Sequence, residues 1–259
     1  MAQITEQDRF NPDQIDNTVV GIAADIGRHD SGMHHHQKAQ LLYAPAGCMS
    51  ITLSNMQCVL PPTRAAWIPA GIEHCAVMRN VVAYRSIYFD TDCFQHLPNE
   101  LKVLSVNGLL RELIERMAFW PWDMPSQEQQ ALLALFWQEL KVAPEETLTL
   151  PKPQDHRLQE WLKAIEQHNG IPPSLNQTAS MVGASDKTIS RIFSRETGMP
   201  YQSWRQQWRL MKAIELLAEN TSITDVAFQL EFSSDSAFIS FFRQHTGETP
   251  HQYLRSIPK

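Results

Sequence analysis

A short segment in the C-terminal part of the sequence carries polar residues with the types and spacing needed to contact DNA. A helix that begins at Ser185 is predicted there, because Ile189, Ile192 and Phe193 mark one apolar face. Arginine can form two hydrogen bonds to a guanine edge, so Arg191 is the candidate base contact. Contacts to phosphates set the orientation of the protein and its salt dependence rather than its sequence preference. The outward residues are Lys187, Thr188, Ser190 and Arg191, and the candidate phosphate contacts are Arg195, Arg205 and Arg209.

A phrase that follows this segment occurs twice in the chain. "TGMPYQSWR" (197–205) returns as "TGETPHQYLR" (246–255), with Thr-Gly, Pro, Gln and Arg in the same order. Ahead of each copy, a short helix with a buried-type alanine leads through a tight turn to a second helix. The pattern predicts two helix-turn-helix units, at about 174–197 and about 223–246, joined by one long helix. An all-α bundle with an accidental repeat is the alternative.

These hundred residues resemble the AraC/XylS family of bacterial transcription regulators. The resemblance is carried by "SDKTISRIFSRETG" with its downstream "RLMKAIELL", and by "ITDVAFQLEFSSDSAFISFFRQHTGETPHQYLR". It implies that the two recognition helices enter successive major-groove segments of double-stranded DNA, with Arg191 at a base-contacting position. It also accounts for the repeated phrase, because each Thr-Gly would end a recognition helix and each Pro would start the next helix.

The second unit departs from the family pattern at two positions. Glu231 stands where the family usually has glycine, and Ser240 stands where it usually has arginine. Such a surface can still touch thymine methyl groups or a phosphate, but it attracts DNA less strongly. We therefore expect this unit to contribute less to affinity. Its candidate contacts are Asp235, Ser236, Ile239 and Ser240.

The N-terminal part shows short β-type runs separated by Pro and Gly, which is typical of a compact β-domain. Within it, "GMHHHQKAQLLYAPAG" and "IPAGIEH" resemble the two cupin motifs, which converge inside a small β-barrel. The resemblance implies an effector-binding site. Its residues would be His34, His36, Gln40 and His74.

The chemistry of that site has three interpretations. The imidazoles of His34, His36 and His74 could hold a divalent metal such as Zn, Fe, Ni or Mn. Gln40 replaces the usual glutamate with a neutral, weaker ligand, which argues against a metal. The alternatives are a small-molecule effector bound without metal, and a barrel that keeps the motif only for its turns.

The elements that position these residues predict an α+β chain. We expect a cupin-like β-barrel domain at 1–98, a helical dimerisation segment and linker at 99–154, and an all-α DNA-binding domain at 155–259. The helical segment has an amphipathic stripe, which we expect to pair two chains in a homodimer. Packing of the stripe onto its own β-domain is the alternative. The stripe consists of Leu110, Leu113, Ile114 and Met117.

Composition limits the possible partners and location. The net charge is −6, and all of it lies in 1–154, because 155–259 carries 11 basic and 11 acidic residues. The chain is therefore not a strongly basic nucleic-acid binder, and DNA affinity must come from where its charges sit. A polar start and the lack of a long apolar run predict a cytoplasmic protein without a membrane partner. The four cysteines, without a CxxC pair, are expected to be reduced, buried thiols.

Two classes of function fit these observations. The first is a transcription regulator, an activator or a repressor, that binds double-stranded DNA and a small-molecule effector. The second is a cupin metalloenzyme, a dioxygenase or isomerase, whose DNA-binding domain serves as a localiser. Gln40 in place of a carboxylate, and the lack of another obvious acid or base beside the motifs, favour the first class, so we expect no enzyme activity.

Overall fold

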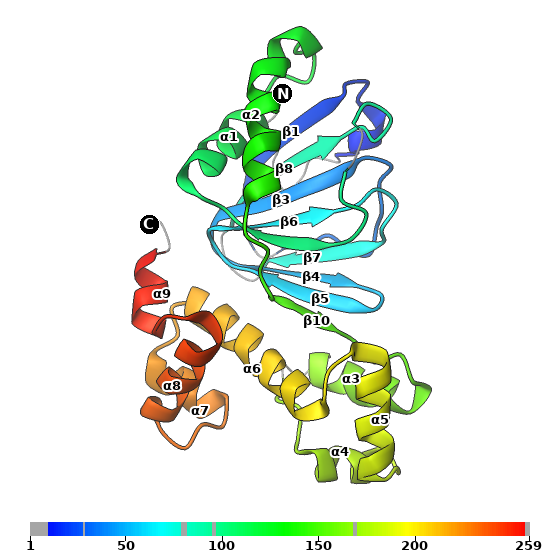
Figure 1. Cartoon of the computed structure of the whole chain (residues 1–259), viewed down its shortest axis with the longest axis vertical. Coiled ribbons are helices and arrows are strands. Elements are labelled where there is room, and N and C mark those ends of the chain that lie inside the picture. Colours follow the sequence, from blue (N-terminus) through cyan, green and yellow to red (C-terminus); the bar gives the residue numbers. More distant parts are fainter. Residues whose placement is uncertain (1–9, 28, 79–81, 95–96, 168–169, 257–259) are drawn as a thin grey trace. The chain divides into compact units, whose positions relative to one another are not determined.

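The computed structural model describes residues 10–27, 29–78, 82–94, 97–167 and 170–256. The chain forms two compact units, a β-rich one and a helical one (Figure 1). Of the described residues, the first unit comprises those within 10–53 and 59–147, and the second comprises those within 54–58 and 148–255.

Antiparallel β-sheets form the body of the first unit. Its strands are β1 (Val19–Ile26), β2 (His29–Asp30), β3 (Ala39–Ala46), β4 (Met49–Leu53), β6 (Arg64–Ile68), β7 (His74–Met78), β8 (Val82–Phe89) and β9 (Lys102–Ser105), and the short 3-10 helix η1 (Pro12–Gln14) precedes them. One sheet has the order β1-β8-β3-β6-β9, and in another sheet β7 lies between β4 and β2. Buried and half-buried residues alternate along β4, as expected for a strand with one face toward the core. This is the cupin-like arrangement that the sequence predicted.

Two helices, α1 (Gly108–Ala118) and α2 (Ser126–Val142), complete the first unit. The apolar stripe of α1 lies in the same buried cluster as β-sheet residues such as Trp67 and Phe89. Helix α1 approaches β1 so closely that a Cβ added at Gly21 would lie 2.1 Å from the carbonyl oxygen of Met117. The expectation that this stripe pairs two chains is therefore wrong, and its packing onto the chain's own β-domain is confirmed. Residues 99–147 belong to the first unit rather than to a separate segment.

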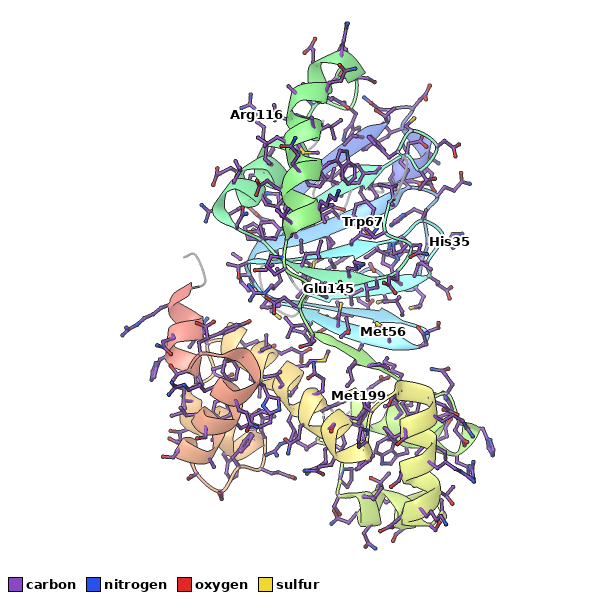
Figure 2. The ribbon with its side chains drawn as sticks, in the orientation of Figure 1. His35, Met56, Trp67, Arg116, Glu145 and Met199 are labelled. Carbon is purple, nitrogen blue, oxygen red and sulfur yellow. The ribbon has the colours of Figure 1, made fainter. Side chains whose placement is uncertain are left out.

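Aromatic side chains fill the space between α2 and the sheet. Trp67, labelled in Figure 2, is fully buried, and its indole N–H donates to the carbonyl oxygen of Pro98 at 3.0 Å. The rings of Phe89 and Phe136 are stacked, with their centroids 5.5 Å apart. This packing fixes α2 on the unit, because large aromatic side chains contribute most to core energetics.

The second unit contains seven helices among the described residues, together with strand β10 and the first three residues of strand β5. They are β5 (Met56–Leu60), β10 (Thr149–Pro151), α3 (His156–Gln167), α4 (Leu175–Met181), α5 (Asp186–Thr197), α6 (Tyr201–Ala218), α7 (Ile223–Gln229), α8 (Asp235–Thr246) and α9 (Pro250–Ser256). Strand β10 pairs with β5, and the indole N–H of Trp204 donates to the carbonyl oxygen of Pro151 at 2.7 Å. The continuous C-terminal part of the second unit therefore begins at Leu148, before the expected boundary at 155.

The repeated Thr-Gly pair ends both recognition helices in the same way. The hydroxyl of Thr197 donates to the carbonyl oxygen of Phe193 at 2.7 Å, and that of Thr246 donates to the carbonyl oxygen of Phe242 at 2.9 Å. The next residue, Gly198 or Gly247, is in the left-handed conformation in each copy, where glycine carries no steric penalty. Pro200 then caps α6 and Pro250 begins α9, as the repeat predicted.

Two further expectations concern the thiols and the membrane. Cys48, Cys58 and Cys75 are buried and Cys93 is exposed, so the expectation of buried thiols is wrong for Cys93. None of the four forms a disulfide. Within the described part of the chain, no helix combines the length and the apolar character that a membrane crossing needs.

Candidate functional site

Three histidine side chains meet in the first unit. His34 and His74 face each other across the backbone, and each amide donates to the other's carbonyl oxygen, at 3.0 and 2.9 Å. The ring centroid of His74 lies 4.5 Å from that of His34 and 5.1 Å from that of His36. One ring nitrogen of each histidine lies within 4.8 Å of the other two. The structure thus brings together the three histidines that the two motifs predicted, which we call the histidine cluster.

Backbone carbonyl groups fix the tautomer of each ring. Nδ1 of His34 lies 3.0 Å from the carbonyl oxygen of Gly32, and Nδ1 of His74 lies 2.8 Å from that of Ile72. Nδ1 of His36 makes the same contact with the carbonyl oxygen of Lys38. A carbonyl oxygen only accepts hydrogen bonds, so each Nδ1 carries a proton and each Nε2 keeps its lone pair. Metal-binding histidines in proteins are oriented by the same type of contact.

Burial keeps two of these rings neutral. It lowers the pKa of His36 and lowers the pKa of His74 to about 4. A neutral imidazole is the form that binds a metal, because protonation would occupy the ligating nitrogen.

The side chain of Gln40 completes the cluster. Its Oε1 lies 3.1 Å from Nε2 of His36, while its Nε2 donates to the hydroxyls of Ser86 at 2.8 Å and Tyr88 at 3.1 Å. In this orientation two acceptor atoms face each other, an arrangement that a cation beside them would stabilise. The opposite amide orientation would instead donate from Gln40 to His36 and would need no cation.

The polar partners of Gln40 come from one face of β8. Tyr84, Ser86 and Tyr88 alternate along this strand, so all three side chains point to the same side of the sheet. Tyr88 pairs with Gln40 in the register of β8 and β3, and its ring packs edge-on against His36 with the centroids 5.1 Å apart. Sequence reasoning missed these residues, although hydroxyl groups at every second position of a strand are a signal that could have found them.

The residues present fit a divalent transition metal. Three imidazole nitrogens converge, their orientations are set by carbonyl groups, and the side-chain amide of Gln40 lies beside one of them. Imidazole ligands suit Zn, Fe, Ni and Cu, and an amide oxygen is a neutral ligand that does not add negative charge.

The other candidate site lies on the helical unit, where α5 presents the predicted polar face. The hydroxyl of Ser185 accepts from the amide of Thr188 at 3.2 Å and so caps the helix. Lys187 and Arg191 are exposed, and neither side chain makes a hydrogen bond or ion pair with the described residues. Thr188 and Ser190 are half-buried. Arg191 is therefore available for a base edge without breaking any contact within the protein.

The structure places Arg195 at the junction of two helices. Its guanidinium contacts the carboxylates of Glu196 and Asp155, the latter at 3.8 Å, yet 58% of the side chain stays exposed. Glu196 in turn accepts from the amides of Gln154 and Asp155, both at 2.9 Å, at the start of α3. Arg195 can reach solvent while it also supports this junction.

Two other arginines that we expected at the phosphates are engaged inside the unit. The guanidinium of Arg209 donates twice to the carbonyl oxygen of Leu230 and lies 3.8 Å from the ring centroid of Phe232, and only 7% of Arg209 is exposed. Arg205 donates to the carbonyl oxygen of Pro172 and pairs with Glu231 at 3.5 Å. Arg209 is therefore a structural residue, because a buried guanidinium cannot meet a phosphate. Arg205 is engaged by Pro172, before α4, and by Glu231, after α7.

Helix α8 carries the second set of candidate contacts. Ser236 and Ser240 are exposed, Ile239 is half-buried, and Asp235 accepts a hydrogen bond from the hydroxyl of Thr224 at 2.7 Å. Sequence reasoning missed Arg243, which is exposed one turn after Ser240 and whose side chain makes no hydrogen bond or ion pair with the described residues. Residues three apart share a helix face, so this face does carry a cation.

The helical unit contains two capped recognition helices joined by α6, and the β-domain contains a polar cluster. These features are those of a DNA-binding regulator with a ligand-binding domain. Comparison with known families gives the same result. A model of the AraC-like ligand binding domain matches residues 17–148, and a model of a helix-turn-helix domain matches residues 178–256. The first match covers more than half of the 259 residues, and the chain belongs to the AraC family of transcription regulators.

The chain is also similar to individual proteins. The HTH-type transcriptional regulator NimR of Escherichia coli is 26% identical over 251 residues, which cover 96% of this chain and 92% of NimR. The HTH-type transcriptional regulator RipA of Corynebacterium glutamicum is 31% identical over 105 residues, which cover 40% of this chain and 32% of RipA. The structure of ToxT from Vibrio cholerae aligns with 94% of this chain and all of that chain, at 9% identity and a TM-score of 0.38.

Proposed function

We propose that this transcription regulator binds its effector at the histidine cluster and recognises its operator mainly through α5. The observation that carries the first half is the convergence of three imidazole nitrogens with the amide of Gln40 and the hydroxyls of β8. The second half is supported by Arg191, an exposed guanidinium without a protein partner among the described residues, on a helix that Ser185 caps.

We further propose that the histidine cluster holds a divalent transition metal. The three fixed tautomers and the convergence of the three ring nitrogens support this. Such a metal would supply positive charge and open coordination positions for an effector with oxygen or nitrogen donor atoms. The protein's own contribution is to hold the three rings in place and to keep two of them neutral through burial.

Cobalt(II) titration of the purified protein tests the metal proposal, because cobalt bound by several imidazoles gives a visible absorption spectrum. The spectrum is expected for the wild type and lost in His36→Ala. His35→Ala is the matched control, since this neighbouring histidine is exposed and lies at the edge of the first unit (Figure 2). The proposal would be contradicted if elemental analysis found no metal in the purified protein and cobalt gave no spectrum. The remaining interpretation would then be an effector that binds without metal.

Genome-wide mapping of bound DNA, followed by footprinting, tests the DNA half. We expect a small number of strongly protected sites and weak binding elsewhere, because residues 155–259 have no net charge. Uniform weak binding without protected sites would contradict sequence-specific recognition. The same experiment identifies the operator and the regulated genes.

We propose that the protein acts as a homodimer through the outer face of α2. Ala131, Leu135, Gln138 and Val142 are exposed at alternating spacings of four and three residues, opposite the buried side of the helix. This is the spacing of a coiled-coil seam, and Val142 is 71% exposed. Two copies of α2 could therefore pair, and sedimentation of the full-length protein tests this.

We also propose that the protein works in the cytoplasm and has no catalytic activity of its own. The amide of Gln40 stands where the cupin motif has a carboxylate, which supports binding rather than metal-dependent turnover. Oxygen-consumption and isomerisation assays on the metal-loaded protein test this. Turnover that His36→Ala abolishes would support the alternative, a cupin enzyme.

A further inference from the structure

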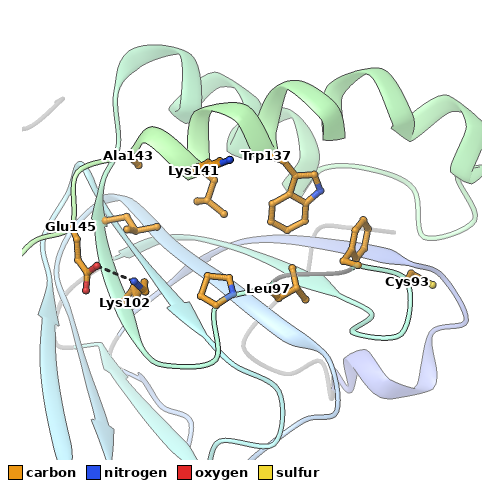
Figure 3. A pocket seen from close by; sticks show the side chains of 11 residues that line it. Cys93, Leu97, Lys102, Trp137, Lys141, Ala143 and Glu145 are labelled. Carbon is orange, nitrogen blue, oxygen red and sulfur yellow. Dashed lines mark hydrogen bonds and ion pairs between the residues drawn. The ribbon is translucent and has the colours of Figure 1, made fainter.

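The first unit contains a pocket that lies apart from the histidine cluster. It has a volume of about 560 Å³ and lies between the end of α2, strand β9 and the segment before β9 (Figure 3). None of the three histidines lines it. This volume is within the range of small-molecule sites, roughly 300–1,000 Å³.

The inner wall of the pocket is aromatic and aliphatic. Trp137 and Phe94 lie on it with their ring centroids 5.4 Å apart, and Leu97 and Leu140 extend the same surface. Trp137 also packs on the buried ring of Phe89 at 4.8 Å, so its ring is held in place. A flat apolar ligand could stack there without ordering any mobile side chain, and preorganisation of this kind reduces the cost of binding.

Among the charged residues that line the pocket, two are lysines and one is a glutamate, and Lys102 also pairs with Glu100 outside the pocket at 3.8 Å. Lys102 and Glu145 face each other at 3.0 Å at one end of the pocket, which Figure 3 shows, and they compensate each other. Lys141 also lines the pocket, is exposed, and makes no ion pair with the described residues. An anionic group on the ligand would therefore find one uncompensated ammonium group.

The pocket includes the segment that leads out of the first unit. Ala143 and Glu145 line it, and the continuous C-terminal part of the second unit begins at Leu148. This connecting segment, 143–147, runs along β9: the amide of Ser105 donates to the carbonyl oxygen of Pro144, and the amide of Glu146 donates to that of Val103, both at 2.8 Å. A ligand that contacts Ala143 and Trp137 at once would hold this segment against α2.

We propose that this pocket is a second effector site, which binds a planar aromatic anion such as an aromatic carboxylate or sulfonate. The rings stack on Trp137 and Phe94, and the anionic group pairs with Lys141. Occupancy fixes the connecting segment and thereby restricts the start of the DNA-binding unit. The site acts independently of the histidine cluster.

The probe is 1-anilinonaphthalene-8-sulfonate, an aromatic anion that fluoresces when it enters an apolar site, and the full-length protein is used throughout. Ala143→Phe fills the pocket and is expected to weaken probe binding at least tenfold. Ala134→Phe makes the same change on the exposed side of α2, outside the pocket, and should bind like the wild type. If Ala143→Phe fails to fold, Leu97→Trp fills the pocket from the opposite wall.

Charge and independence need separate variants. Lys141→Met is expected to weaken probe binding several-fold, and Lys141→Arg is expected to restore it. His36→Ala should leave probe binding unchanged. The proposal is overturned if both pocket-filling variants bind the probe like the wild type, or if His36→Ala removes probe binding.

Two chemical readouts locate the bound probe. Cys93 is the exposed one among the four thiols and lies at the rim, so the probe should slow its alkylation by iodoacetamide at least threefold. The probe should likewise slow cleavage after Glu145 and Glu146 by a glutamate-specific protease. Unchanged alkylation would place the probe elsewhere and overturn the site, and unchanged cleavage would overturn its effect on the connecting segment.

Discussion

Glu231 adopts in the second helix-turn-helix unit the left-handed backbone conformation that Gly183 adopts in the first, with φ of 56° against 64°. Each residue follows the C-cap of the first helix of its unit, so the two turns have the same path. A side chain in this conformation is strained, whereas glycine is not. The chain therefore keeps the turn of the family pattern at position 231 but stores strain in it.

Glu231→Gly should raise the free energy of unfolding by about 1 kcal/mol, because the relief of strain exceeds the entropy that glycine adds to the unfolded chain. The lost pair with Arg205 is solvent-exposed on the glutamate side and should subtract only a few tenths of a kcal/mol or so. Urea unfolding of the full-length protein measures the change. Gly183→Ala adds a side chain at the matching position of the first helix-turn-helix unit and should destabilise the protein. A Glu231→Gly protein that is less stable than the wild type would refute the strain argument.

Substitutions of Arg209 and Arg195 should have different effects, the first on stability and the second on DNA binding. Arg209→Met removes a buried guanidinium from the Leu230 carbonyl and the Phe232 ring, and it should cost roughly 2–3 kcal/mol of stability. Arg195→Met should cost little stability but reduce the salt dependence of DNA binding by about one unit of slope. Thermal melts and salt titrations of operator binding measure both. The structural assignment of Arg209 fails if its loss changes the salt slope without lowering stability.

The two helices of the first unit should respond differently to a new charge. Leu113→Glu buries an unpaired carboxylate in the core and should unfold the first unit, with a loss above roughly 3 kcal/mol. Val142→Glu lies on the exposed face of α2 and should leave the fold intact while it dissociates the dimer. Circular dichroism and sedimentation decide between these outcomes. A Val142→Glu protein with unchanged sedimentation would exclude the α2 interface.

A DNA-binding fragment should be more stable if it starts at residue 148 than at 155. The longer fragment keeps the hydrogen bond from Trp204 to Pro151 and the ion pair of Lys152 with Glu166 at 2.7 Å. A difference of at least about 1 kcal/mol is expected from the hydrogen bond alone. Both fragments should bind the operator, and equal stability would show that residues 148–154 add nothing to the unit.

The sequence was most informative where a local pattern determines the structure. The helix start at Ser185 was predicted from a local pattern, and the Thr-Gly helix ends and the three histidines were implied by the repeat and by family resemblance; the structure has them where they were expected. The surface against which the α1 stripe packs was not predictable in this way. An amphipathic helix shows only that Leu113 needs an apolar partner, and the partner was set by the close approach to Gly21 on a distant strand.

Side-chain roles on the helical unit show the same limit. Arg191 and Arg209 look alike in the sequence, since each lies in a predicted helix and is followed directly by an apolar residue, Ile192 or Leu210. Their difference comes from Phe232 and the Leu230 carbonyl, which reach Arg209 only through the fold of the second helix-turn-helix unit. The pocket beside Trp137 was invisible for a similar reason, because its walls come from segments far apart in the chain.

The central claim is that α5 is the principal reader of DNA sequence, and Arg191→Ala tests it most directly. Binding of this variant and of Ser240→Ala, its counterpart on α8, is measured against a set of operators with single base changes. Arg191→Ala should lose roughly 1–3 kcal/mol of discrimination at one or two neighbouring base pairs near one end of the half-site, while Ser240→Ala changes little. An Arg191→Ala protein that binds every operator variant equally less tightly would mean that Arg191 contacts a phosphate, and the claim would then be wrong.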